Sequence, residues 1–132
     1  MIQIQNFINK YKGQFVTNAD GSYKDECVSL CHRWQDENGW PEIHANAIDW
    51  QKFGGWNGYQ FIVNHVWTIP KTGDVAVFNC GKYGHVGIVV SANIKSMVVF
   101  NQNYPHGTNI DPATLTTFNY TAPKCIGFIR RV

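Results

Sequence analysis

The sequence predicts a single α+β domain, residues 1–132, in which N-terminal helices pack on a C-terminal antiparallel β-sheet. The length of 132 residues suits one domain, because domains usually hold roughly 100–200 residues. The apolar residues favour strands: there are 12 Ile and 12 Val but only 2 Leu, and β-branched side chains fit a pleated sheet. The hydrophobic spacing also changes after Pro70 from helical to strand-like, and helices followed by strands are typical of the α+β class.

Four segments of the first half are expected to be helical. The first has apolar residues at three- and four-residue spacing, namely Ile4, Phe7, Ile8 and Tyr11 before Gly13. The second runs from about Asp25 to Asn38 and ends at Gly39. Its inward stripe consists of Cys27, Leu30, Cys31 and Trp34. Two shorter helical pieces are expected over residues 46–53 and 58–64, on either side of Gly54-Gly55.

Four segments of the second half are expected to be strands, because β-branched and aromatic residues fill them and turn residues bound them. They are Asp74–Asn79, His85–Ala92, Ser96–Asn103 and Cys125–Val132. A turn at Asn93–Lys95 would pair the second and third of these strands in antiparallel fashion.

The composition excludes several classes of protein. Disorder needs low hydrophobicity and high net charge, whereas 44% of these residues are hydrophobic and the net charge is +2. No stretch approaches the about 18 apolar residues of a membrane span. A nucleic-acid partner is not expected either, because the positive charge is small and dispersed.

The N-terminal segment has no apolar run long enough for a signal peptide. We therefore expect synthesis in the cytoplasm, or origin as a domain of a longer chain. The 4 cysteines contain no C-x-x-C pair of the kind that structural zinc sites use. Without an export signal, disulfides are not expected.

Cys27 is the candidate nucleophile among the four cysteines. It falls in the first turn of the second expected helix, where free backbone N–H groups and the helix dipole lower a thiol pKa. A buried structural cysteine is the alternative, because that is the commonest role of a free cysteine. Cys31, one turn further on, is interpreted as core, and Cys80 and Cys125, in or beside strands, as core or loop packing.

His85 is the candidate base, because a nucleophilic cysteine needs one. It opens an apolar strand directly after Gly84, so the ring would be exposed while the sheet fixes its position. A half-exposed histidine at a strand end is the alternative. The other histidines are expected in loops or facing away from Cys27: His32, His44, His65 and His106.

Asn101 and Asn103 are the candidates for a third element. Both lie in the strand after His85, so pairing of the two strands would bring Asn101 near the ring. A side-chain carbonyl there would accept the imidazole Nδ1–H and fix the tautomer. The alternative is that both asparagines serve turns at the strand end.

Five motifs follow one another along nearly the whole chain: DGSYKDECVSLCHRW, PKTGDVAVF, YGHVGIVV, FNQNY and CIGFIRRV. Their order and spacing together resemble the CHAP family (cysteine, histidine-dependent amidohydrolases/peptidases) of peptidoglycan hydrolases. The resemblance implies a papain-like α+β fold with the cysteine helix packed against the sheet. It also implies cleavage of amide bonds in the bacterial cell wall, often by a phage endolysin.

The resemblance assigns roles by position. Cys27 resembles the family nucleophile and His85 its general base, while Asn101 stands where relatives carry the Glu, Asp or Asn that orients the histidine. Asn103 matches a further active-site asparagine of some lysins. Glu26 departs from the usual Gln before the nucleophile, so an amide donor near the oxyanion becomes an acceptor.

Some CHAP lysins bind calcium in the loop before the nucleophile, and the matching residues here are Asn18, Asp20, Ser22, Lys24 and Ser29. Only Asp20 brings a charge at this spacing, whereas calcium prefers several carboxylates. We therefore expect no cofactor and no metal, with Asn18, Asp20 and Ser22 as the candidates if calcium does bind. The alternative interpretation of this segment is a polar turn.

The tryptophans of the irregular middle segment, Trp50, Trp56 and Trp67, are candidates for lining a groove that leads to Cys27, and Trp56 is the one we select for substrate binding. Flat aromatic faces suit a glycopeptide ligand, and core packing is the alternative for each of them.

The resulting hypothesis is a monomeric cysteine amidohydrolase or peptidase that acts on peptidoglycan of the bacterial wall, after release or as part of a phage particle or larger lysin. The substrate bond would be a peptide bond or the link between muramic acid and L-alanine. A catalytically inactive wall-binding or structural module with the same fold is the second hypothesis, and Glu26 favours it. A metalloenzyme is the third, but no H-E-x-x-H motif supports it.

Overall fold

The computed structural model describes residues 1–132 as three helices and six strands. The helices are α1 (Ile4–Tyr11), α2 (Cys27–Glu37) and the 3-10 helix η1 (Ala47–Phe53). The strands are β1 (Tyr59–Val63), β2 (Val75–Asn79), β3 (His85–Ala92), β4 (Met97–Asn101), β5 (Thr114–Phe118) and β6 (Lys124–Arg131). Helices therefore precede the sheet, and the predicted α+β class is confirmed.

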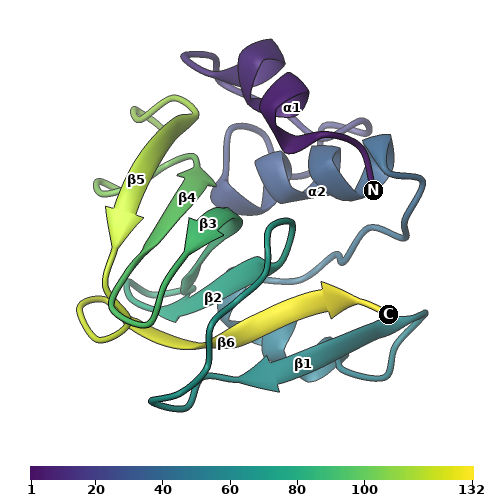
Figure 1. Ribbon diagram of the computed structural model, residues 1–132. Helices are drawn as coiled ribbons and strands as arrows, with labels where there is room; N and C mark the ends of the chain where they lie inside the picture. The colour runs from purple at the N-terminus through teal and green to yellow at the C-terminus, as the bar shows by residue number, and fades with distance from the viewer.

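The strands form one antiparallel sheet in the order β1-β6-β2-β3-β4-β5. Both α-helices lie on one side of the sheet, above its central strands, and the twist of the sheet carries β1 and β5 to its opposite ends (Figure 1). Helix α2 packs on β3. This packing fixes the start of the helix relative to the sheet.

Both faces of the central strands are buried, which explains their nearly continuous apolar sequence. Side chains alternate between the two faces of a strand. In β2, Val75 and Val77 belong to the core under the helices, whereas Ala76 and Phe78 belong to a second core on the opposite face. The helix-side core is closed by aromatic residues that include Trp34, which meets Phe7 edge-on at 5.1 Å between ring centroids.

An ion pair joins two of the motifs that are far apart in the sequence. Asp74 precedes β2 and is buried, with 3% of its surface exposed. Arg130 of β6 donates from Nε and Nη2 to its two carboxylate oxygens, at 2.9 and 2.7 Å. Such a two-bonded arrangement is geometrically specific, so it fixes β6 beside the start of β2.

The helix predicted over residues 58–64 is wrong, because Tyr59–Val63 form strand β1. This strand pairs with β6, with Tyr59 opposite Arg131 and Val63 opposite Gly127. A short apolar run fits a buried helix or a strand equally well. The distant β6 supplies the partner that decides between them.

Strand β5 (Thr114–Phe118) was absent from the expected elements. Its residues alternate between partly buried and exposed, as in an edge strand with one covered face. It pairs with β4, where Thr114 lies opposite Asn101. The strand predicted over residues 96–103 therefore ends at Asn101, and the expected helix over residues 46–53 is the 3-10 helix η1.

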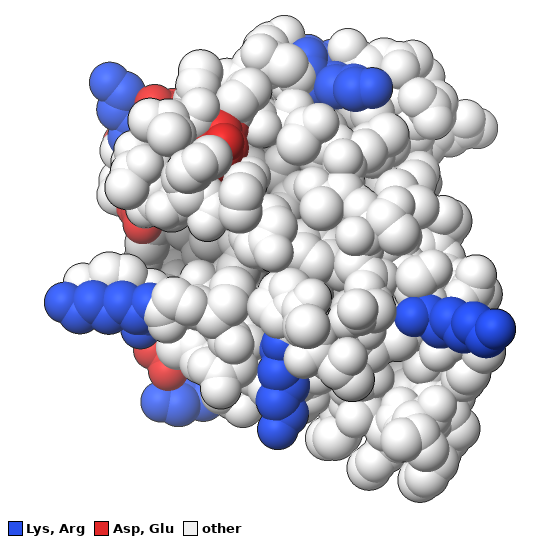
Figure 2. Space-filling view, turned by 90° about the vertical axis from the view of Figure 1, so that its left-hand side faces the viewer, with Lys and Arg blue, Asp and Glu red and all other residues white.

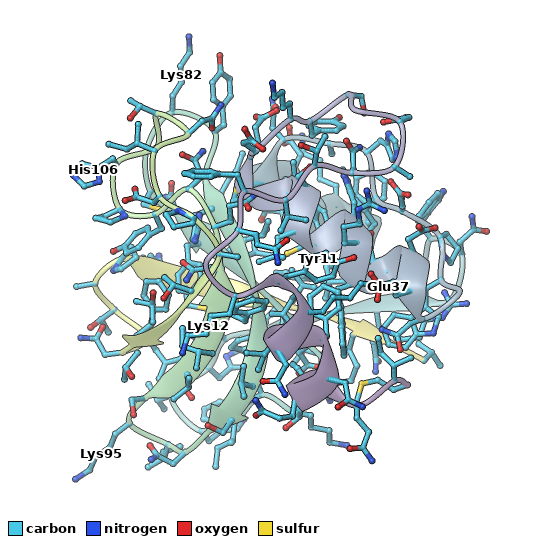
Figure 3. The ribbon with its side chains drawn as sticks, turned by 90° about the horizontal axis from the view of Figure 1, so that it is seen from above. Tyr11, Lys12, Glu37, Lys82, Lys95 and His106 are labelled. Atoms are coloured by element: carbon cyan, nitrogen blue, oxygen red, sulfur yellow. The ribbon has the colours of Figure 1, made fainter.

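Helices α1 and α2 are also linked by polar contacts at their C-terminal ends. The Tyr11 hydroxyl donates a hydrogen bond to the Glu37 carboxylate, and Figure 3 shows these two side chains facing each other. Lys10 Nζ lies 3.2 Å from the same carboxylate.

No helix of this fold has the length and apolar character needed to cross a membrane.

Candidate active site

A pocket of about 390 Å³ lies between the start of α2, the segment before η1, and the loops that precede β3 and follow β4. It is lined by Tyr23, Glu26, Cys27, Val28, Asn46, Ala47, residues 81–85, Asn103, His106, Gly107 and Asn109. A larger pocket, of about 480 Å³, lies at the other end of the sheet and contains Cys125. Only the first pocket brings together a cysteine and a histidine that the sequence selects.

Cys27 is the first residue of α2, and its side chain is almost completely buried. Burial raises the pKa of the Cys27 thiol to about 11, although the backbone N–H groups of Val86 and Val28 oppose this rise. The prediction that the helix start lowers the pKa of the Cys27 thiol is therefore wrong for the free protein. Desolvation of a thiolate outweighs its stabilisation by two backbone dipoles.

His85 is positioned by a tight turn that requires glycine. Gly84 has a φ of +79°, and a Cβ built there would lie 2.7 Å from the backbone nitrogen of Ile48. The turn can therefore pack directly against η1, where Ile48 N–H donates to Tyr83 O at 2.8 Å. This contact between η1 and the turn sets where β3 begins, and thus where the ring of His85 lies.

His85 and Asn101 are joined by a buried hydrogen bond of 2.8 Å between Nε2 and Oδ1. The Asn101 amide nitrogen donates to Thr114 O at 3.2 Å and to Thr116 Oγ1 at 2.9 Å, both on β5. A backbone carbonyl can only accept, so the amide must present its oxygen to the ring. The His85 tautomer that satisfies this contact carries its proton on Nε2.

The ring nitrogen predicted to meet Asn101 was Nδ1, and this prediction is wrong because Nε2 makes the bond. Nδ1 is therefore the atom left with a lone pair. Burial lowers the pKa of His85 to about 4, against the smaller opposing effect of Asn101. Cys27 and His85 line one pocket as a neutral thiol and a neutral imidazole, with no hydrogen bond between them. Such contacts often tighten only when substrate binds.

Glu26 and Asn103 also reach this pocket. Burial raises the pKa of the Glu26 carboxyl group, and its charge further disfavours the Cys27 thiolate. Asn103 has a φ of +62°, and its Oδ1 accepts from Asn109 N–H at 2.7 Å. Asn103 thus orders the loop at the pocket wall, whereas Asn101 contacts the histidine.

Gln102 is a residue that the sequence interpretation missed, although it stands between the two selected asparagines. Its side chain is buried, with 1% exposed. Nε2 donates to Val16 O at 2.8 Å and to Glu26 O at 2.9 Å, while Oε1 accepts from Val16 N–H at 2.6 Å. Gln102 therefore ties the residue before Cys27 to the end of β4.

The candidate calcium residues bond to one another. Asn18 N–H donates to Ser29 Oγ at 2.6 Å, and its Nδ2 donates to Ser22 Oγ at 3.0 Å. Ser22 in turn donates from its N–H and its hydroxyl to Asp20 Oδ1. These contacts connect the residues of the loop to one another and to Ser29, and Asp20 supplies the only charge among the three candidates.

Trp56 does not line the pocket, and neither do Trp50 and Trp67. Trp56 stacks on Tyr59 at the junction between η1 and β1, with 6.2 Å between ring centroids, and Trp50 is completely buried. Among the histidines, His106 joins the rim and contacts Asp111 at 3.0 Å, whereas His32 lies on the buried side of α2.

Charged side chains at the rim of the pocket are few, namely Glu26 and Lys82. Lys82 and His106 project outward from the two loops that form it (Figure 3). On the face that contains β5, Lys and Arg side chains stand apart from one another, with wide uncharged areas between them (Figure 2).

A helix that begins with a cysteine, packed on an antiparallel sheet that carries a His–Asn pair, defines the papain-like α+β class that the sequence predicted. Within this class, the chain belongs to the CHAP domain family, whose model matches residues 16–103. The resemblance drawn from the five sequence motifs is therefore confirmed.

Relatives and solved structures agree with this assignment. Endolysin LysK of Staphylococcus phage K is 32% identical over 102 residues, which cover 72% of this chain and 20% of LysK. The crystal structure of endolysin LysIME-EF1 matches with a TM-score of 0.78 and 27% identity, over 99% of this chain and 65% of that one. Ly7917 has the same fold, with a TM-score of 0.65 and 16% identity over 96% of this chain and 60% of its own. The chain thus spans a fifth of LysK and under two thirds of LysIME-EF1.

Proposed function

We propose that this chain hydrolyses amide bonds of bacterial peptidoglycan, with Cys27 as nucleophile and His85 as general base. The observation that carries the proposal is that the His85–Asn101 hydrogen bond lies at the same pocket as the helix-start thiol of Cys27. The relatives support the substrate, because LysK and LysIME-EF1 are both endolysins.

The first half of the proposed reaction forms an acyl-enzyme. Cys27 Sγ attacks the amide carbonyl carbon while His85 Nδ1 takes the thiol proton, so that the attack does not require a pre-formed thiolate. The negative oxygen of the tetrahedral intermediate is held by the backbone N–H of Cys27, which has no partner within the helix because it opens α2. His85 then gives the proton to the leaving amine, and the C–N bond breaks.

The second half releases the acyl group. His85 Nδ1 takes a proton from water, and the resulting hydroxide attacks the thioester carbon. The C–S bond breaks, the thiolate recovers its proton from His85, and a carboxylic acid leaves. Asn101 keeps Nε2 protonated throughout by accepting its hydrogen bond, so the same ring nitrogen acts in both halves.

Gln102 is a positioning residue in this proposal. It bonds to the carbonyl oxygen of Glu26 and thus fixes the peptide unit that carries the Cys27 N–H. Asn101 and Gln102 are neighbours in sequence, so one strand end aligns both the base and the segment that presents the nucleophile.

Digestion of purified cell walls tests the proposal directly. Walls of several bacterial species are incubated with the chain and with folded Cys27→Ala and His85→Ala variants, and the released fragments are analysed by mass spectrometry. New amine and carboxyl ends that appear with the parent chain alone support the reaction. The masses distinguish an endopeptidase from an N-acetylmuramoyl-L-alanine amidase.

A catalytically inactive wall-binding module is the second candidate, and the negative charge of Glu26 beside a high-pKa thiol favours it. In that case the chain would sediment with purified walls, no fragment would be released, and Cys27→Ala would bind as well as the parent. Release of fragments that depends on Cys27 excludes this candidate.

A further inference from the structure

A cluster of three metal-binding side chains lies outside the candidate active site. His32 comes from the buried side of α2, and Glu42 and His44 come from the segment between α2 and η1. One ligand atom from each lies within 4.8 Å of the other two. His44 Nε2 lies 3.0 Å from Glu42 Oε1, and His32 Nδ1 lies 3.9 Å from the same oxygen.

The spacing of these atoms fits a small tetrahedral ion. Zinc bonds to histidine nitrogen at about 2.0–2.1 Å, so two ligands of a tetrahedral ion lie about 3.4 Å apart. The two contacts to Glu42 fall about half an ångström on either side of this separation. The planes of the His32 and His44 rings differ by only 22°, and a metal ion lies in the plane of each imidazole that binds it. The exposed ring of His44 must therefore turn out of this stack to bring its nitrogen onto the same ion.

His32 is already held in the state that a metal requires. Its Nε2–H donates to Ile43 O at 2.6 Å, which leaves the lone pair on Nδ1, the atom that faces Glu42. A histidine that binds metal through one nitrogen usually donates from the other to a carbonyl or carboxylate.

In this structure His32 Nδ1 accepts a long hydrogen bond of 3.3 Å from Asn18 Nδ2. The same amide group also donates to Ser22 Oγ at 3.0 Å, so Asn18 keeps a hydrogen bond if an ion takes the lone pair of His32. Replacement of this contact by a coordination bond therefore leaves the Asn18 amide nitrogen with its hydrogen bond to Ser22.

Aromatic packing orients the two rings, and one side stays open to solvent. His32 and His44 stack with 4.8 Å between centroids, and Tyr23 meets both rings edge-on. The side chains of His44 and Glu42 are 43% and 20% exposed. An ion can thus enter from solvent and keep a water molecule as its fourth ligand.

We propose that His32, Glu42 and His44 bind a Zn²⁺ ion, with water completing a tetrahedral site. Two imidazoles and one carboxylate suit zinc, whereas calcium takes six to eight oxygen ligands. The ion would connect α2 to the segment that leads into the pocket wall at Asn46 and Ala47. The site is independent of the proposed hydrolysis because no ligand belongs to the catalytic set.

Calorimetric titration of chelator-stripped protein with Zn²⁺ tests the proposal. We expect one ion per chain, with affinity at least about ten-fold weaker in Glu42→Gln and His44→Gln, since loss of even an outer contact to a metal ligand costs that much. His65→Gln is the matched control, because His65 is an exposed histidine that stacks on Trp67 away from the cluster. Its affinity should equal that of the parent.

Two further arms identify the site and the ion. The same titration in Cys27→Ala should still show one Zn²⁺, and Zn²⁺ should raise the melting temperature of the parent but not of His44→Gln. Calcium should do neither. The proposal is overturned if the parent binds no zinc, if both cluster variants bind as the parent does, or if binding disappears in Cys27→Ala, which would place the ion at the active-site thiol.

Discussion

Asn101 Oδ1 lies 2.8 Å from His85 Nε2, and this contact determines which ring nitrogen is free to exchange a proton. The Asn101 amide nitrogen is held by Thr114 and Thr116 of β5, so its oxygen cannot turn away from the ring. A neutral His85 therefore has its lone pair on Nδ1. The edge strand β5 thus acts on the proposed base through Asn101.

Cys27→Ala should abolish wall lysis while the fold is kept. Loss of a covalent nucleophile typically costs several orders of magnitude in rate, whereas removal of one sulfur atom perturbs the packing little. The decrease in turbidity of a wall suspension measures lysis, and circular dichroism checks the fold.

Cys31→Ala is the matched control, because Cys31 is a buried cysteine one turn further along α2. It should cost about 1–2 kcal/mol of unfolding free energy and keep full activity per folded molecule. Lysis that persists in folded Cys27→Ala would contradict the proposed mechanism.

Asn101→Ala should lower kcat more than Asn103→Ala and less than His85→Ala. Asn101 orients the ring but exchanges no proton, so its loss leaves nucleophile and base present but less often aligned. Asn103 contacts Asn109 at the pocket wall, so its loss should act mainly on KM. The three variants are compared by steady-state kinetics on one wall substrate. A fully active Asn101→Ala with an inactive Asn103→Ala would assign the orienting role to Asn103.

The acid limb of the kcat/KM profile should lie well below the ordinary histidine pKa of about 6.5. The proposed base works as neutral imidazole, and burial lowers the pKa of His85 to about 4, so the base stays competent until the pH falls toward that value. Asn101→Asp should shift the limb upward, because a carboxylate stabilises the protonated ring. A parent limb at or above pH 6.5 would mean that the reacting base is not a buried His85 ring with a lowered pKa.

Stability must be followed in the same pH range. The lowered pKa of His85 means that the unfolded chain takes up the proton more readily than the folded chain, so unfolding free energy should fall as the pH drops from about 6.5 toward 4. Circular dichroism at each pH restricts the kinetic profile to folded protein.

Glu26→Gln should raise kcat/KM. The substitution removes the charge that opposes formation of the Cys27 thiolate and offers an amide donor beside the oxyanion, where one donor is worth as much as about 10²–10³ in rate. Glu26→Ala separates the two effects, since it removes the charge and adds no donor. Equal rates in the parent and Glu26→Gln would mean that the side chain points away from the reacting carbonyl.

Calcium added to chelator-treated protein should change lysis little. Asn18, Ser22 and Ser29 are bonded to one another, and Asp20 is the only carboxylate among the matching positions, so few oxygens remain for a calcium ion. Rates are measured with and without calcium after zinc has been restored. A large recovery with calcium alone would show that the loop rearranges into a metal site.

The sequence by itself determined the helices and strands whose pattern lies in residues close together along the chain. The spacing in α1 and α2, the β-branched strands after Pro70 and the order of five motifs gave the α+β class and the CHAP family. The motifs also singled out Cys27, His85 and Asn101, two of which the structure joins by a hydrogen bond. These patterns suffice because helix faces, strand alternation and turn residues are properties of neighbouring residues.

Only the tertiary structure decided the features that depend on distant partners. Strand β1 is a strand because β6 pairs with it, and Gln102 holds the segment before Cys27 from 76 residues away in sequence. The orientation of the His85 ring determines that Asn101 bonds to Nε2. Burial raises the pKa of Cys27 and lowers the pKa of His85. Packing determines these quantities, because the solvent around a side chain and the direction of its hydrogen bonds are set by segments far along the chain.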